Sequence, residues 1–152
     1  LRNEMLYQQK VILKDIKTSD VIQSFHDKKF VDYLISYQPV KINSWDGIEN
    51  GKVASFSFWF FGWKNMKVIH DGYEVSESYL HFEDKGLELP FGLMSWNHHH
   101  KVLNHEKGTL IIDHISVESG SSIKKYVIFP IMLIPIFIRK ITYKVWFYYI
   151  NK

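Results

Sequence analysis

The sequence predicts one α+β domain, in which a curved antiparallel sheet is covered by a long C-terminal helix. Residues 39–118 alternate apolar and polar side chains, which is typical of half-buried strands. Residues 122–152 return to helical spacing. The apolar face of a sheet must be covered, and this last segment is the only long helix that the pattern predicts. Because the chain contains no repeat or linker, we expect residues 1–152 to form a single domain.

Composition limits the classes of site that this chain can hold. Its 152 residues include no cysteine, which excludes a disulfide framework, a thiolate zinc site, an iron–sulfur cluster and a cysteine nucleophile. Hydrophobic residues make up 46% and charged residues 23%, so the chain is expected to be globular rather than disordered. Aromatic residues make up 16%, and so much ring area requires a large core, a cavity or a partner.

Positive charge is concentrated at the C-terminus. Residues 123–152 contain six of the 19 bases and none of the 16 acids, so this segment carries +6 and the other 13 bases and 16 acids sum to −3. We interpret the bases as the solvated surface of a helix. The alternative is contact with an anionic membrane surface or an acidic partner. Nucleic acid is not expected, because the bases form no dense stripe interleaved with aromatic residues.

The most apolar segment is too short to be predicted as a membrane span. Residues 126–138 form an uncharged run of 13 residues, which as a helix is roughly 20 Å long against a hydrocarbon core of roughly 30 Å. A buried or interfacial helix is therefore expected. Residues 1–22 contain no apolar core followed by small residues, so we expect no signal peptide and a cytoplasmic location.

The first elements are a strand and a pair of short helices. Residues 7–16 are rich in strand formers. The segment 18–20 (Thr-Ser-Asp) offers helix N-cap residues. Apolar spacing over residues 21–37 predicts two short helices that break near Asp27, and Pro39 ends the second one.

A series of strands joined by short turns follows, which predicts an antiparallel meander. Alternation places Phe56, Phe58 and Phe60 on one face. In the next strand it places Ile69 and Tyr73 together on one face. The expected strands are 40–45, 52–61, 67–76, 79–84, 95–104 and 109–118.

The C-terminal helix is expected to present one apolar stripe to the sheet. Interior prolines cost a helix about 3 kcal/mol or more, so Pro130 and Pro135 predict a kink or a split. A curved sheet that grips a helix does not close tightly along its length, so a cavity is expected between them. The expected stripe consists of Ile134, Ile138, Ile141, Val145 and Tyr148.

The most unusual segment is Trp96-Asn97-His98-His99-His100. On a strand, Trp96, His98 and His100 share one face. A two-residue turn at 106–107 pairs residues whose numbers sum to 213, so that His100 lies opposite Asp113 and His98 opposite Ile115. A three-residue turn would place His100 opposite His114. We favour the first register because it aligns the apolar faces of the two strands.

Three interpretations of His98, His100 and Asp113 remain open. They form a buried polar network that supports the sheet, since buried imidazoles and carboxylates must be paired. Alternatively, they anchor a polar group of a ligand inside an apolar cavity. The third interpretation is a metal site with these three residues as ligands, or acid–base catalysis by a histidine.

These residues also resemble a known family. The pattern Trp96-x-His98-x-His100, followed by Gly108-Thr109-x-Ile111-x-Asp113, resembles the bacterial ligand-binding branch of the START-like, or SRPBCC, superfamily. The resemblance implies a helix-grip fold, with a seven-stranded antiparallel sheet wrapped around a long C-terminal helix and two short helices after the first strand. It also implies a hydrophobic pocket. Members include lipid-transfer domains, polyketide cyclases and plant hormone binders.

We therefore expect binding of a small, mostly hydrophobic molecule, such as a lipid, polyketide or isoprenoid, between sheet and helix. One alternative is a cyclase- or dehydratase-type enzyme with His98 or His100 as general base. Another is a membrane-surface lipid carrier in which Trp146, Phe147, Tyr149 and Ile150 enter a bilayer, although the same residues would suit a homodimer. We expect no cofactor and no metal, and assign no catalytic residue. The expected ligand-binding residues are Phe56, Phe58, Phe60, Tyr73, Phe82, Trp96, His98, His100, Asp113, Ile134, Ile138 and Ile141.

Overall fold

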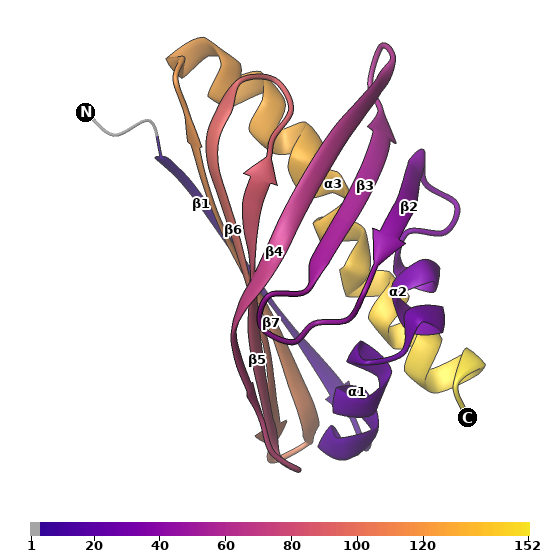
Figure 1. Ribbon diagram of the computed structural model, residues 1–152. Helices are drawn as coiled ribbons and strands as arrows, with labels where there is room; N and C mark the ends of the chain where they lie inside the picture. The colour runs from indigo at the N-terminus through magenta and orange to yellow at the C-terminus, as the bar shows by residue number, and fades with distance from the viewer. Residues whose placement is uncertain (1–3) are drawn as a thin grey trace.

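A computed structural model of the chain confirms the α+β architecture and the helix-grip arrangement (Figure 1). It describes residues 4–152, apart from the side chain of residue 124. Seven strands form one antiparallel sheet in the order β1-β7-β6-β5-β4-β3-β2. The elements are β1 (Glu4–Lys14), α1 (Thr18–Phe25), α2 (Lys28–Leu34), β2 (Val40–Trp45), β3 (Val53–Trp59), β4 (Trp63–Val75), β5 (Tyr79–Glu88), β6 (Leu93–His105), β7 (Gly108–Ser119), α3 (Ser122–Val145) and a closing π-helical turn, η1 (Trp146–Ile150).

The central hairpin has the predicted register. In β6 and β7, His100 pairs with Asp113 and His98 with Ile115. The turn between these strands requires Gly108, whose φ of +147° lies in a region that side chains rarely adopt. A Cβ atom at this position would overlap the carbonyl oxygen of Leu13 on β1. The glycine therefore permits β1, β7 and the two-residue turn to meet.

The predicted face of β4 is wrong in its first half. Ile69 is only partly buried, whereas Val68 and His70 are buried. The pairing of β4 with β5 shifts between Asp71 and Glu74. This bulge inserts an extra residue and reverses which side chains face inward. Strict alternation through the bulge therefore placed Ile69 on the inner face together with Tyr73, whereas Val68 and His70 are the inward residues.

The two short helices are separate, as predicted, and Asp27 starts the second one. Its side chain accepts a hydrogen bond from the backbone N–H of Lys29 at 2.9 Å. The expected cap of α1 is different: Lys17 holds the N-cap position and provides no side-chain hydrogen bond. Thr18 is buried and hydrogen-bonds the hydroxyl of Thr109 at 3.0 Å. It fastens α1 to β7 instead of capping the helix.

The prolines do not split α3. The helix runs without interruption from Ser122 to Val145, with Pro130 and Pro135 inside it. Tertiary packing outweighs local propensity in most protein helices. Here Ile128, Met132 and Ile136 are buried against the sheet on the inner face of the helix. This packing holds the segment helical despite the two missing backbone donors.

The predicted apolar stripe of α3 does not pack on the sheet, although two of its residues, Ile134 and Ile138, line the interior at the edge of the helix. Ile134 and Ile141 are 54% and 67% exposed. Apolar residues surround this helix, so hydrophobic spacing alone does not identify its inner face. The polar side chains of Arg139 and Tyr143 point inward, where their partners lie. The buried positions are Ile128, Phe129, Met132, Ile136, Tyr143, Trp146 and Phe147.

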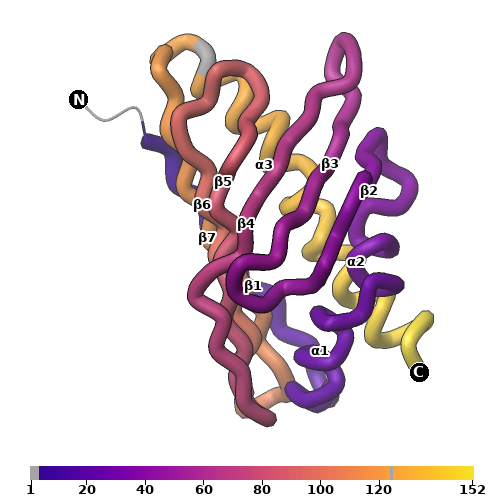
Figure 2. Tube along the Cα trace, in the orientation of Figure 1, coloured from indigo at the N-terminus to yellow at the C-terminus, as the bar shows by residue number. Residues whose placement is uncertain are grey.

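The sheet curls around α3, which passes between the β2–β4 side and the β1–β7 side (Figure 2). The first half of α3 packs on both sides, because Met132 and Ile136 share one core cluster with Ala54 of β3 and Ile115 of β7. The end of α3 joins a second cluster with α1 and α2, in which Phe30 contacts the ring of Tyr143. The candidate functional residues lie in the interior between these two clusters.

Candidate functional site

A cavity of about 460 Å³ lies between the sheet and the middle of α3. Its wall is mostly apolar, as expected for a pocket that takes small molecules. Three of the residues that line the cavity are exposed to solvent: Tyr37 before β2, Trp59 at the end of β3 and Ile134 on α3. The apolar wall includes Val40, Phe56, Phe58, Phe60, Met66, Val68, Trp96, Ile131, Met132, Pro135, Ile136 and Ile138.

The structure separates the twelve expected ligand-binding residues into two groups. The first group lines the cavity and consists of Phe56, Phe58, Phe60, Trp96, His98, Ile134 and Ile138. The second group, Tyr73, Phe82, His100, Asp113 and Ile141, does not line it.

The second group lies elsewhere for three physical reasons. Ile141 is on the outer face of α3, because the helix is rotated from the expected orientation. Tyr73 lies within the β4 bulge, where its hydroxyl meets Nε2 of His26 at 2.7 Å. Phe82 is buried and stacks on the ring of His100 at 4.2 Å, and both lie behind the wall together with Asp113.

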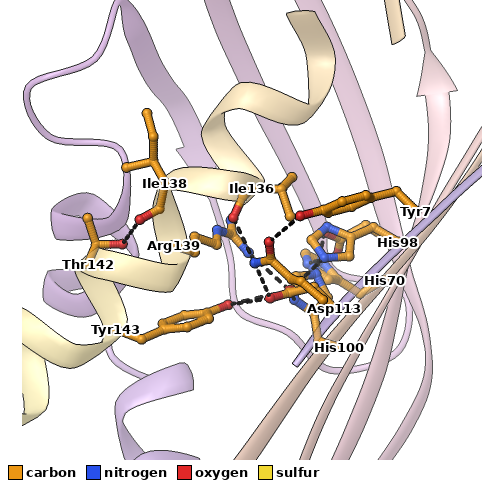
Figure 3. A network of polar contacts seen from close by, with 12 residues as sticks. Tyr7, His70, His98, His100, Asp113, Ile136, Ile138, Arg139, Thr142 and Tyr143 are labelled. Carbon is orange, nitrogen blue, oxygen red and sulfur yellow. Dashed lines mark hydrogen bonds and ion pairs between the residues drawn. The ribbon is translucent and has the colours of Figure 1, made fainter. Parts of the chain in front are cut away.

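A network of buried polar side chains, which we call the polar cluster, reaches the cavity wall (Figure 3). Asp84, His98 and Arg139 of this cluster are on the cavity wall. The others lie behind them, on β1, β4, β6, β7 and α3. The polar cluster consists of Gln9, His70, Asp84, His98, His100, Asp113, Arg139 and Tyr143.

Asp113 is the most heavily bonded member. Its Oδ1 accepts a hydrogen bond from Nε2 of His98 at 2.8 Å. Its Oδ2 accepts from the hydroxyl of Tyr143 at 3.0 Å and from Nε2 of Gln9 at 3.2 Å. Burial disfavours the charge on Asp113, but the imidazoles of His100, whose Nδ1 lies 3.5 Å from Oδ1, and of His98 outweigh it and hold its pKa well below 3.8. Asp113 is therefore a buried carboxylate anion.

Asp84 is the second buried anion. Its Oδ2 accepts from Nε2 of His100 at 2.9 Å, and its Oδ1 lies 3.0 Å from Nε2 of His70. Burial opposes its charge, but His100 and His70 together keep its pKa well below 3.8.

The protonation of His70 follows from its two contacts. Its Nδ1 lies 2.9 Å from the carbonyl oxygen of Lys52, which can only accept, so Nδ1 carries a proton. Its Nε2 then faces the Asp84 carboxylate and can donate to it only when the ring is cationic. Burial lowers the pKa of His70, but Asp84 reverses this and raises it above 6.5. The pKa of His100 is likewise raised, because Asp84 and Asp113 together outweigh its burial.

His98 differs from its two neighbours. Burial, reinforced by the charge of His100, lowers the pKa of His98 to about 4, although Asp113 opposes the shift. His98 is therefore neutral near pH 7, with its proton on Nε2 for Asp113. Its Nδ1 is 3.9 Å from Asp84 and carries a free lone pair. The cavity wall thus offers an acceptor nitrogen, a carboxylate and a guanidinium.

Asp84, Arg139 and His70 were missed in the sequence. Asp84 continues the inward alternation of Leu80 and Phe82, so a charged residue on an apolar strand face was the available signal. Arg139 lies at helical spacing between Ile136 and Tyr143, but so many apolar residues surround it that the spacing was ambiguous. His70 was concealed by the bulge, which no short-range pattern reveals.

A metal ion would find a different set of ligands from the one expected. Within the described residues, ligand atoms of Asp84, His98 and His100 lie within 4.8 Å of one another. Asp113, one of the expected ligands, is not in this group. His100 and Asp84 already hydrogen-bond each other, and Arg139 shares the cavity wall with two of the three residues. A cation at this position would have to displace the hydrogen bond between His100 and Asp84, and it would be repelled by the positive charge of Arg139.

Comparison with known proteins identifies the fold. No protein-family model matches the sequence, and no curated protein matches it. Protein Ms6760 from Mycobacterium smegmatis aligns with a TM-score of 0.67 at 9% identity, covering 94% of this chain and 89% of that chain. Protein SA2116 of Staphylococcus aureus, whose function is unknown, aligns at 0.65 and 10% identity over 93% and 91%. A Thalictrum norcoclaurine synthase variant aligns at 0.57 and 12% identity over 95% and 96%. The chain has the START-like, or SRPBCC, fold.

Proposed function

We propose that this protein binds a small, mostly apolar molecule in the cavity between sheet and α3, and does so in the cytoplasm. The observation that carries the proposal is the cavity itself, about 460 Å³ in volume, with an aromatic and aliphatic wall that the polar cluster reaches. Pockets that take small molecules commonly have this combination of apolar walls and few polar groups. The fold adds support, because the norcoclaurine synthase variant was solved in complex with a transition-state analogue.

Binding of a neutral fluorescent dye tests the proposal. N-phenyl-1-naphthylamine should enter the cavity and gain fluorescence. Val40→Trp should weaken the binding, because Val40 is on the cavity wall and the larger ring fills the space. Val75→Trp is the matched control, since Val75 is 48% exposed at the end of β4 and away from the cavity. Absence of dye binding, or equal loss in both variants, would contradict the proposal.

Binding is favoured over catalysis by the charge state of His98. Its hydrogen bond to Asp113 orients the ring as in a histidine base, which supports the enzyme alternative. However, a pKa of about 4 makes His98 a poor proton acceptor near pH 7. His100, with a raised pKa, lies behind the wall and does not line the cavity. Both observations argue against His98 or His100 as the general base.

A membrane-surface carrier is the second candidate, and the outer face of α3 favours it. By length and composition, Lys125–Ile150 is apolar enough to cross a membrane, although only 28% of its apolar window is buried in this fold. Trp146 and Phe147 are buried, which corrects their expected contact with a bilayer. Other side chains cover the outer face: Ile123, Tyr126, Val127, Ile134, Phe137, Ile141, Tyr149 and Ile150 are exposed.

The charge of this face suits an anionic lipid surface. Nζ of Lys140 lies 4.7 Å from the ring centre of Phe137, and Nζ of Lys125 lies 5.1 Å from that of Tyr126. Residues 123–152 contain no acid. The side chain of Lys124, counted among the bases of this segment, lies outside the described part. Apolar side chains flanked by lysines are typical of peripheral membrane contacts.

Vesicle co-sedimentation tests this candidate. The protein should sediment with phosphatidylcholine vesicles that contain phosphatidylserine, and less with phosphatidylcholine alone. Ile141→Ser should reduce sedimentation, whereas Leu6→Ser, at a β1 position that is 62% exposed, should not. A concentration-dependent dimer that Ile141→Ser dissociates, without any vesicle binding, would assign this face to a second copy instead.

A further inference from the structure

Arg139 is the one cationic side chain among the described residues of the cavity wall whose charge is independent of pH. It projects inward from α3 toward the polar cluster, between the inward Ile136 and the cavity-lining Ile138 (Figure 3). Its side chain is 16% exposed, so the guanidinium is largely desolvated but open on one side. A buried charge of this kind needs a partner close at hand.

The protein itself satisfies Arg139 only in part. The nearest carboxylate oxygen, Oδ1 of Asp113, is 3.7 Å from Nη1, which is beyond hydrogen-bond distance. Its other polar neighbours are the Tyr143 hydroxyl and the Asp84 carboxylate, which lies on the same cavity wall. A bidentate pair between arginine and a carboxylate would have N···O distances of about 2.7–2.9 Å. The described residues provide no such pair for Arg139, although this cation can form several hydrogen bonds at once.

Both carboxylates of the polar cluster contact other groups, although among the described residues Oδ1 of Asp84 accepts no hydrogen bond. Asp113 accepts from His98, Tyr143 and Gln9 at 2.8–3.2 Å. Asp84 accepts from His100 at 2.9 Å and lies 3.0 Å from His70. Neither can turn toward the guanidinium without leaving a buried donor unpaired.

The charges of the polar cluster do not balance when His70 and His100, which lie behind the cavity wall, are both protonated. Asp84 and Asp113 supply two negative charges. Arg139, His70 and His100 then supply three positive charges, and His98 is neutral. The pKa of both His70 and His100 is raised, which favours this state. A surplus positive charge beside an apolar cavity is costly to bury, and an anion from outside would compensate it.

We propose that the ligand carries a single anionic head group, a carboxylate or a phosphate ester, which pairs with Arg139 while its apolar part lies along Phe56, Phe58 and Trp96. This inference rests on the proposed function and names the class of its ligand. The free Nδ1 of His98 accepts a hydrogen bond from any hydroxyl or protonated oxygen of the same head group. The ligand is therefore amphipathic, with its charged end innermost.

Competition against the neutral dye tests the inference. Decanoate, decyl phosphate and decanol are compared as competitors of N-phenyl-1-naphthylamine at pH 7. At least one of the two anions should bind roughly tenfold or more tightly than decanol, which is the effect of a charge-assisted hydrogen bond of about 1.4 kcal/mol or more. The tighter anion identifies the head group.

Variants assign this preference to one side chain. Arg139→Gln should abolish the advantage of the anions while decanol and dye still bind. Lys140→Gln is the matched control, because Lys140 is the next residue and is exposed on the outer face of α3. It should keep the advantage. Arg139→Lys retains the charge and should retain part of the preference, and it serves as the second variant if Arg139→Gln does not fold.

Three outcomes would overturn the inference. In the first, decanol binds the wild-type protein at least as tightly as either anion. This comparison requires no variant. Alternatively, Lys140→Gln removes the advantage as completely as Arg139→Gln does. In both cases the dye still binds, so the proposed apolar cavity stands. If neither the dye nor any competitor binds, the inference and the proposed function both fail.

Discussion

Replacement of Asp113 by asparagine tests whether the polar cluster holds the fold together. Asp113 is almost completely buried, and its two oxygens accept from His98, Tyr143 and Gln9. An asparagine amide has one acceptor oxygen, and its NH₂ group would face at least one of these donors. The substitution also removes the negative charge that lies near Arg139 and that helps to raise the pKa of His100.

The expected loss of stability is large. Breaking a buried ion pair by removing one partner costs about 3–5 kcal/mol. Total stabilities of domains are about 5–15 kcal/mol, so Asp113→Asn should lose a substantial fraction of the free energy of unfolding. With a urea m-value of about 1–3 kcal/mol per M, the midpoint of unfolding should fall by at least about 1 M.

Urea unfolding followed by far-UV circular dichroism measures this loss, with Asp71→Asn as the matched control. Asp71 is an exposed carboxylate 2.7 Å from Nζ of Lys85, so it makes the same substitution at a surface ion pair. Surface pairs contribute little, and this variant should unfold close to the wild-type midpoint. If the two variants shift the midpoint equally, the cluster does not have the structural role described above.

Four further predictions address other parts of the fold. The pKa of His98 is about 4 in the folded protein and about 6.5 in the unfolded chain, so its contribution to stability falls as the pH drops from 6.5 toward 4. His98→Gln should reduce the loss of stability between pH 7 and pH 5 by up to about 2 kcal/mol, measured by urea unfolding at each pH. Tyr143→Phe removes a buried donor to a carboxylate and should cost about 1–3 kcal/mol, measured at pH 7 by the same unfolding. Gly108→Ala would force a Cβ against the carbonyl of Leu13 and should lower the stability by more than about 1 kcal/mol, and an unchanged thermal midpoint would contradict the described turn. Pro130→Ala restores a backbone donor at an exposed position of α3 and should raise stability by up to about 3 kcal/mol, whereas a loss would mean that this segment is not a regular helix.

The polar cluster explains why a histidine-rich strand occurs in this fold. His98 and His100 follow each other on the inner face of β6, with ring centres 3.7 Å apart. Two adjacent imidazoles do not both remain cationic at this distance. Their different contacts with the two carboxylates give them different pKa values. His100 is held near the charged form by Asp84 and Asp113, whereas His98 is held neutral by burial and by His100. The two imidazoles of the strand therefore differ in basicity: the pKa of His100 is raised, whereas His98 is a neutral acceptor near pH 7.

The meander and the register of its last hairpin were accessible from the sequence because they depend on local signals, whereas the pairing of β1 with β7 joins segments that are distant in the chain. Alternation, turn residues and the spacing of the short helices predicted the meander, and the two-residue turn predicted that His100 lies opposite Asp113. Strand periodicity and turn geometry involve neighbours within a few residues, so short-range patterns contain this information.

The orientation of α3 and the make-up of the polar cluster depended on tertiary structure. All faces of α3 are almost equally apolar, so hydrophobicity does not decide which face turns inward. The inner face is the one that carries Arg139 and Tyr143, because both contact the buried Asp113, which is distant in the sequence. The β4 bulge that turns His70 inward is likewise defined only by its pairing with β5. The amino-acid sequence alone determined which strands and helices form and how β6 pairs with β7. Which charged side chains meet beside the cavity was decided by packing between distant segments, because a buried charge takes its position from its partner.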